Sequence, residues 1–229
     1  KLLPFIDENN KIFFSIIPDG FDPDDFIKKK GKDMFINLLK EKYKNDDRIV
    51  FLEEPVDTWE KVTQDGKNIL ELFYENQQKY SFPFQILAYT TRLQLLKNEI
   101  KRSMEDSNIK TIVMERSLEA DRNIFAKMLY DDGMIEPSMF QIYTKMSDDG
   151  LREYSADAII WLDTDPEACF GRIQKRNREG EESISKKYLD RLDIYHQEWL
   201  SADTGFVFRT STNESEHLEW DKLDKYMIH

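Results

Sequence analysis

KTIVMERSLEADRNIFA, residues 110–126, is the stretch of sequence that decides the fold. Its first six residues form a short, mostly apolar run, which is typical of a buried β-strand. Charged residues follow where that strand would end: Glu115 and Arg116, and then Asp121 and Arg122. The first question is whether this pattern, an apolar run with charged residues at its end, recurs along the chain.

The pattern recurs, and it predicts an α/β fold. Stretches with apolar residues at helical spacing separate the runs, for example NILELFYENQQKY and ISKKYLDRLDIYHQEWL. Alternating strands and helices predict one domain, residues 1–229, with a parallel five-stranded sheet and helices on both faces. The expected strands are 11–17, 48–53, 110–115, 157–162 and 206–210.

Composition and charge exclude several classes of function. The 229 residues carry a net charge of −12, which argues against binding to duplex nucleic acid, because that needs a basic face. Cys169 is the only cysteine, so no internal disulfide is possible, and we expect an intracellular, cytoplasmic protein. No apolar run approaches the roughly 20 residues that span a bilayer, so we expect no membrane partner.

The residues after the expected strands suggest a site, because active sites of open α/β sheets lie at the carboxyl ends of the strands. Glu54 follows the second run, Glu115 and Arg116 the third, and Asp163 and Asp165 the fourth. A single cluster of this kind is best explained as solvated charge. Three clusters at regular spacing favour a site for a polar substrate and a phosphate.

Four motifs follow one another along the chain. They are EPVDTW (54–59), YENQQKYSFPFQ (74–85) with Arg92, ERSLEADRNIFA (115–126) and RIQKRNREGEESI (172–184). Over about residues 41–211 they resemble the deoxynucleoside kinases. This resemblance implies a P-loop-kinase-type fold with an arginine-rich lid at 172–184. It also implies ATP and Mg²⁺ as cofactors, a deoxynucleoside and a nucleoside triphosphate as partners, and a homodimer.

The resemblance assigns the transfer chemistry to three residues. Glu54 would be the base that takes the proton of the sugar 5′-hydroxyl, and the alternative is an exposed acid before a proline. Arg116 would hold Glu54 and the 5′-oxygen or a phosphate, since a guanidinium suits both. Glu115 would lie near Mg²⁺, which takes oxygen ligands. Glu115 and Arg116 could equally form a structural salt bridge.

The same comparison of motifs predicts the walls of a nucleobase pocket. Gln85 would make paired hydrogen bonds to the edge of the base, because a lone amide among apolar neighbours needs a partner. The alternative for Gln85 is a polar residue on an exposed helix face. Phe84 and Phe125 would stack on the base, and Trp59 would line the pocket. Ordinary core packing is the alternative for these three aromatic residues.

Five further positions bear on the choice of substrate. Tyr74 and Glu181 resemble the pair that binds the sugar 3′-hydroxyl, although Glu181 could simply belong to a solvated loop. Ala88, Arg92 and Asp121 match the branch of the family that takes deoxycytidine and deoxypurines. An arginine beside an aspartate offers donors and an acceptor to a base that carries an amino group.

Basic residues follow the fourth strand. Arg172, Arg176 and Arg178 resemble the arginines of a lid that closes over the ATP phosphates. Such a cluster is what phosphoryl transfer needs, because its catalysis consists mainly of positioning and charge stabilisation. The alternative is a solvated basic helix end.

The first strand leads into an altered phosphate-binding segment. Gly31 and Lys32 would supply the last glycine and the lysine of a G-x-x-x-x-G-K-[ST] loop. Phe26 occupies the place of the first glycine, and Asp33 that of the hydroxyl that ligates Mg²⁺. Asp33 could in principle still hold the metal. We therefore expect weakened or absent phosphoryl transfer.

Residues 3–39 resemble a fragment of the Toprim domain of bacterial DnaG-type primases, which would replace the P-loop. The other acidic residues of a Toprim site are missing, so primase chemistry does not carry over. Three hypotheses result. The leading one is a deoxynucleoside kinase for deoxycytidine or a deoxypurine; the others are a non-catalytic nucleoside-binding protein and a primase-related enzyme, which the net charge disfavours.

Overall fold

The computed structural model describes residues 12–18, 39–106, 108–176, 184–202 and 206–211. Within these ranges the main element is a five-stranded sheet in which every pair of neighbouring strands is parallel. An α/β fold is thereby confirmed. Across the sheet the strands lie in the order β2 (Ile49–Leu52), β5 (Thr111–Glu115), β1 (Ile12–Pro18), β6 (Ala158–Asp163) and β7 (Phe206–Ser211).

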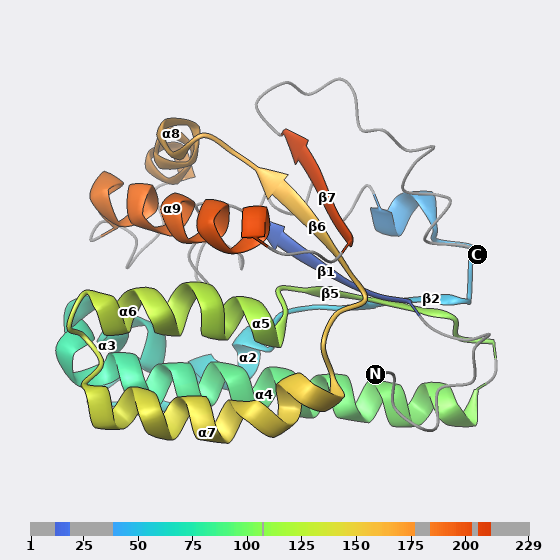
Figure 1. Cartoon of the computed structure of the whole chain (residues 1–229), viewed down its shortest axis with the longest axis horizontal. Coiled ribbons are helices and arrows are strands. Elements are labelled where there is room, and N and C mark those ends of the chain that lie inside the picture. Colours follow the sequence, from blue (N-terminus) through green and yellow to red (C-terminus); the bar gives the residue numbers. More distant parts are fainter. Residues whose placement is uncertain (1–11, 19–38, 107, 177–183, 203–205, 212–229) are drawn as a thin grey trace.

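Helices fill the connections between these strands. In Figure 1, α4 to α7 form a layer on one side of the sheet, and the helical residues 39–42 lie on the other side. No helix of the described ranges is long and apolar enough to span a membrane. The helices are α2 (Val56–Glu60), α3 (Ile69–Glu75), α4 (Gln77–Glu105), α5 (Leu118–Ala120), the π-helix η2 (Asp121–Ala126), α6 (Lys127–Asp131), α7 (Pro137–Glu153), α8 (Pro166–Arg176) and α9 (Lys186–Ala202).

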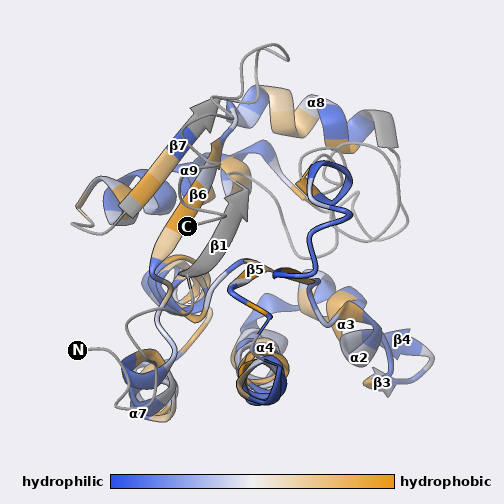
Figure 2. Cartoon of the chain, turned by 90° about the vertical axis from the view of Figure 1, so that its right-hand side faces the viewer, coloured by the Kyte–Doolittle hydropathy of each residue, from blue (hydrophilic) through white to orange (hydrophobic). Residues whose placement is uncertain are grey.

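One face of the sheet supplies most of the described core. Ser15 of the central strand is aligned with Met114 on β5 and with Ile159 on β6, so these two apolar residues share a face. Met114 is buried in a cluster with side chains from α4 and α7, and Ile159 in a cluster with side chains from η2, α8 and α9. Figure 2 shows the apolar colour on β6 and on part of the edge strand β7. Burying this face fixes the helices relative to the strand ends.

The entry into α3 contains a feature that the sequence analysis did not predict. A short antiparallel hairpin, β3 (Thr63–Gln64) and β4 (Lys67–Asn68), turns at Asp65 and Gly66, which both have positive φ. An Asp-Gly pair is the usual signal for this tight turn. Asn68 then caps α3 through a reciprocal pair of hydrogen bonds with Glu71. The hairpin and the cap fix where α3 begins, and they thereby fix the position of Tyr74 near the end of this helix.

The contact between α4 and α7 depends on a glycine. Tyr89 of α4 is fully buried and donates a hydrogen bond of 2.8 Å to the carbonyl of Ser147 on α7. A Cβ atom at Gly150 would overlap the hydroxyl of Tyr89 and lie 3.3 Å from Cδ2 of Leu93. The two helices can approach this closely only because residue 150 has no side chain.

We therefore expect Gly150→Ala to lower the free energy of unfolding by about 1–3 kcal/mol, the usual cost of overpacking a core. Gly171→Ala in α8 is the matched control, because a Cβ atom there meets nothing within 4 Å. Alanine favours the helix, so the control should be neutral or stabilising by up to about 1 kcal/mol. Urea unfolding followed by circular dichroism measures both changes. Equal stability of the two variants would contradict the role given to Gly150.

Candidate active site

Four charged side chains from separate segments meet in the interior. Glu54 follows β2, Arg116 follows β5, Arg92 lies in α4, and Asp121 begins η2. The side chains of Glu54, Arg92 and Arg116 are 1% exposed, and that of Asp121 is 4% exposed. The structure thus brings together the two predicted catalytic residues and two of the three residues predicted to choose the base.

Arg92 is the centre of this group. Its Nη2 donates to Oε1 of Glu54, and its Nη1 donates to Oδ2 of Asp121. Arg116 contributes a longer contact, with Nη1 3.5 Å from the same Oε1 of Glu54. Two cations therefore balance two anions in a space that excludes water, which is the arrangement that buried charges require.

Burial changes the proton affinity of two members of the group. Burial raises the pKa of Asp121 to about 6, although the positive charge of Arg92 opposes the shift. For Arg92, burial alone would lower the pKa, but Asp121 and Glu54 outweigh it and the pKa is raised. Arg92 is therefore always a cation, whereas Asp121 can change its charge near neutral pH.

The turn after β5 aims Arg116 at the site. Arg116 has φ +57°, a left-handed conformation that costs a residue other than glycine about 1–2 kcal/mol. Ser117 then caps α5 by accepting a hydrogen bond of 3.1 Å from the amide of Ala120. The guanidinium of Arg116 lies 4.5 Å from the ring centroid of Phe125. Backbone strain of this kind persists where the fold holds a functional side chain in place.

The predicted aromatic residues form walls around the charged group. Trp59 and Phe84 are fully buried and meet edge to face, with ring centroids 5.4 Å apart. Nε1 of Trp59 donates to Oγ1 of Thr91 at 2.9 Å, and the ring centroid lies 5.9 Å from Cζ of Arg92. Trp59, Phe84 and Ala88 also belong to one core cluster. These residues therefore pack in the core, and Trp59 also lies next to the charged group.

Several buried polar atoms of the described residues have no hydrogen-bond partner. They include Oε1 of Gln85, Oε2 of Glu54 and the hydroxyl of Tyr74. Buried polar groups in folded proteins are normally paired, because leaving one unpaired costs about 1–3 kcal/mol. These three belong to residues that the sequence analysis predicted to bind substrate, and a polar ligand would supply partners for them.

The residues predicted to bind phosphate and metal are only partly described. Glu115 ends β5 and is buried, beside Arg116. Arg172 lies in α8, and Arg176 is the last residue of that helix. Within the described ranges no three acidic, histidine or cysteine side chains form a metal cluster. Gly31, Lys32, Asp33, Arg178 and Glu181 lie outside the described residues.

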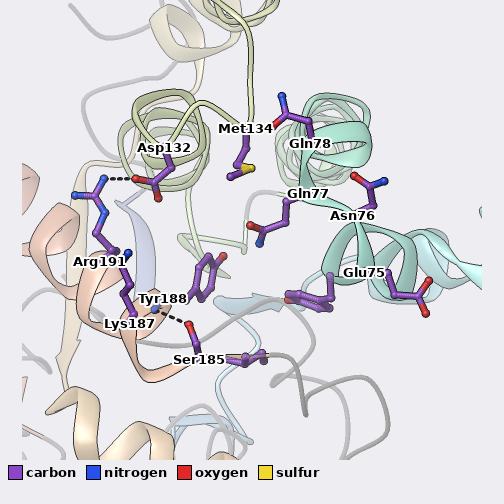
Figure 3. A pocket seen from close by; sticks show the side chains of 12 residues that line it. Glu75, Asn76, Gln77, Gln78, Asp132, Met134, Ser185, Lys187, Tyr188 and Arg191 are labelled. Carbon is purple, nitrogen blue, oxygen red and sulfur yellow. Dashed lines mark hydrogen bonds and ion pairs between the residues drawn. The ribbon is translucent and has the colours of Figure 1, made fainter.

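An open pocket of about 610 Å³ adjoins Tyr74, between α3, α4 and α9. Figure 3 shows Gln77, Met134 and Tyr188 directed toward the same space. On one side of it Nη2 of Arg191 lies 2.5 Å from Oδ1 of Asp132. The sequence analysis did not single out these lining residues, because in α9 they occupy ordinary positions of an amphipathic helix.

His196 is a further buried residue that the sequence analysis did not consider. Its Nδ1 lies 2.7 Å from the carbonyl of Leu192, one turn earlier in α9, so Nδ1 carries the hydrogen. Burial lowers the pKa of His196 to about 4, which keeps the ring neutral. The ring meets Phe125 edge on, with centroids 6.5 Å apart. A neutral imidazole therefore packs behind the ring that contacts Arg116.

Comparison with known proteins places this arrangement in a family. The family model described as deoxynucleoside kinase matches residues 29–225. Deoxycytidine kinase of Rattus norvegicus is 31% identical over 206 residues, covering 82% of this chain and 76% of the relative. The mitochondrial deoxyguanosine kinase of Xenopus laevis is 28% identical over 189 residues, covering 76% of this chain and 70% of the relative.

The match is longer than the motifs indicated. It begins at residue 29 and so includes part of the segment that resembles a primase; the primase resemblance of residues 3–39 stays a prediction. The parallel sheet and its helices agree with the P-loop-kinase α/β fold of the family. The chain belongs to the deoxynucleoside kinase family.

Proposed function

We propose that this protein transfers the γ-phosphoryl group of ATP, with Mg²⁺, to the 5′-hydroxyl of deoxycytidine or a purine deoxynucleoside. The observation that supports this most strongly is the buried group of Glu54, Arg92, Arg116 and Asp121. It joins the residues proposed to activate the hydroxyl to those proposed to recognise the base. We further propose that the chain works as a single domain within a homodimer.

In the proposed reaction Glu54 is the general base. Its Oε2, which is buried and has no hydrogen-bond partner in the described part of the chain, accepts the proton of the 5′-hydroxyl. The 5′-oxygen forms a bond to the γ-phosphorus while the bond from that phosphorus to the β–γ bridging oxygen breaks, and ADP leaves. Arg116 orients Glu54 and offsets negative charge on the transferred group.

Recognition of the base would follow from donors and acceptors at one edge of the pocket. Asp121 accepts from an exocyclic amino group, and Arg92 donates to a neighbouring ring acceptor. Gln85 offers an amide to the same edge, and its Oε1 has no partner among the described residues. Cytosine, adenine and guanine each carry an amino group, whereas thymine does not. This is why we propose deoxycytidine or a deoxypurine.

The remaining assignments concern shape and the sugar. Trp59, Phe84 and Phe125 would enclose the base, and Ala88 would leave room for it. Tyr74 and Glu181 would bind the 3′-hydroxyl. The buried hydroxyl of Tyr74, which has no partner within the described ranges, supports its part in this.

The residues proposed to bind the phosphates and the metal come from three parts of the chain. When bound with ATP, Mg²⁺ would neutralise charge on the β- and γ-phosphates. One buried carboxylate, that of Glu115, fits a metal that keeps waters and substrate oxygens as its other ligands. The residues proposed for the phosphates and metal are Gly31, Lys32, Arg172, Arg176 and Arg178 for phosphate, and Glu115 and Asp33 for Mg²⁺.

A second candidate function is nucleoside binding without phosphoryl transfer. Phe26 and Asp33 in the phosphate-binding segment favour it, because the first glycine and the metal-binding hydroxyl of the usual loop are replaced. The two functions differ only in whether phosphate moves, so a transfer assay separates them.

Glu54→Gln tests the proposed reaction. We expect the wild-type protein to phosphorylate deoxycytidine or a purine deoxynucleoside, and the variant to lose about 10²–10⁴-fold in kcat while still binding the nucleoside. Asp57→Asn, at an exposed position of α2, is the matched control and should behave as wild type. Product formation from labelled ATP and calorimetric binding give the two measurements. Binding without any transfer would identify the second candidate, and equal transfer by wild type and variant would exclude Glu54 as the base.

The pH dependence of binding tests the role of Asp121. Its pKa is raised to about 6, so the carboxylate that accepts from the amino group is present above pH 6 and is lost below it. We expect the Kd for deoxycytidine to be constant above about pH 7 and to rise as the pH falls through 6. Asp121→Asn should bind more weakly, with no such dependence. Calorimetry between pH 5.5 and pH 8 makes the comparison, and a flat wild-type profile would contradict the assignment.

A further inference from the structure

Glu54 lies between two guanidinium groups that hold it unequally. Oε1 of Glu54 accepts from Nη2 of Arg92, whereas Nη1 of Arg116 is 3.5 Å from the same oxygen. The nearer cation is also bound to Asp121, in the pair proposed to recognise the base. The proposed base is therefore held, in this structure, by the residue proposed to read the nucleobase.

Release of Glu54 would leave one donor of Arg92 without an acceptor. The side chain is 1% exposed and stays paired with Asp121 through Nη1, but Nη2 would lose its partner, and a buried donor without an acceptor is unfavourable. A nucleobase with a ring acceptor beside its amino group can replace Glu54 on Nη2, while Asp121 accepts the amino hydrogen.

The walls of the site determine which group moves. Arg92 lies against the ring of Trp59, which the hydrogen bond to the neighbouring Thr91 ties to α4. Arg116 is within ion-pair distance of Glu54 and can receive the carboxylate. Among the described residues, Oε2 of Glu54 has no partner that would anchor it. Glu54 is thus the member of the group that can change its position.

We propose that binding of the nucleobase exchanges an ion pair: the carboxylate of Glu54 passes from Arg92 to Arg116 as the base takes its place on Arg92. The inference rests on the proposed function, which puts the nucleoside beside Arg92 and Asp121. While it is paired with Arg92, Glu54 is kept on the base-reading side. Recognition of the right base then positions the proton acceptor, so the identity of the base acts on transfer as well as on affinity.

The exchange is tested by binding alone, without ATP. The probes are 2′,5′-dideoxycytidine and 2′,5′-dideoxyadenosine, which lack the 5′-hydroxyl and so cannot gain or lose a direct contact between that group and Glu54. Calorimetry compares the wild-type protein with Glu54→Gln. An amide binds Arg92 less strongly than a carboxylate does, so the nucleobase displaces the amide from Arg92 at a lower cost than it displaces the carboxylate. We expect a Kd at least threefold lower for Glu54→Gln.

The control probes are the 3-deaza form of the cytosine compound and the 1-deaza and 7-deaza forms of the adenine compound, in which a C–H replaces a ring acceptor. The analogue that lacks the acceptor for Arg92 cannot displace Glu54, so its Kd should be the same for wild type and variant. A merely structural effect of the substitution would change both kinds of probe alike. Asp57→Asn should leave every Kd unchanged.

Two results would overturn the exchange: an unchanged or higher Kd of the parent probes for Glu54→Gln, or an equal decrease for the deaza probes. Glu54→Ala is measured in parallel and should also lower the Kd of the parent probes. Thermal unfolding shows which of the two variants is folded and can be compared with wild type. Failure of the proposed nucleoside site gives a different result, since no deoxynucleoside with a 5′-hydroxyl would then bind to the wild-type protein.

Discussion

The guanidinium of Arg92, bound by two carboxylates in a space that excludes water, is the interaction on which the arrangement of the site depends. Its partners follow β2 and begin η2, so one side chain of α4 ties the helical layer to the carboxyl ends of the sheet. Removing one partner of a buried ion pair typically costs about 3–5 kcal/mol. The position of α4 is therefore coupled to the charge balance of the site as well as to the core.

Apolar packing supports this charged group from outside. Trp59 and Phe84 enclose it on the side of α4, and Phe125, with the neutral ring of His196 beside it, underlies Arg116. The close approach of α4 and α7 at Gly150 keeps the helix that carries Arg92 and Gln85 in place. Burial of this kind strengthens the ion pairs that hold the carboxylate of Glu54, because the surroundings have a low dielectric.

Much of this fold could be predicted from the sequence. Short apolar runs alternate with stretches that have apolar residues at helical spacing, and this alternation indicates a parallel sheet whatever the individual side chains are. Each expected strand differs from the observed one by only one or two residues at its ends; residues 48–53, for example, contain β2. The β3–β4 hairpin was missed although Asp65 and Gly66 carried its signal. The altered phosphate-binding segment lies outside the described residues, so its role in phosphate binding is still a prediction.

By itself the sequence determined the fold class, the family and the kinds of residue at the strand ends, since these depend on local periodicity and on the order of motifs. Only the tertiary structure decided that Arg92 binds both Glu54 and Asp121, which lie 38 and 29 residues away along the chain. It also decided that His196 is buried behind Phe125. Spacing along a chain does not specify distance across a core, so pairing and burial, and with them the shift in the pKa of Asp121, arise only when the segments pack together.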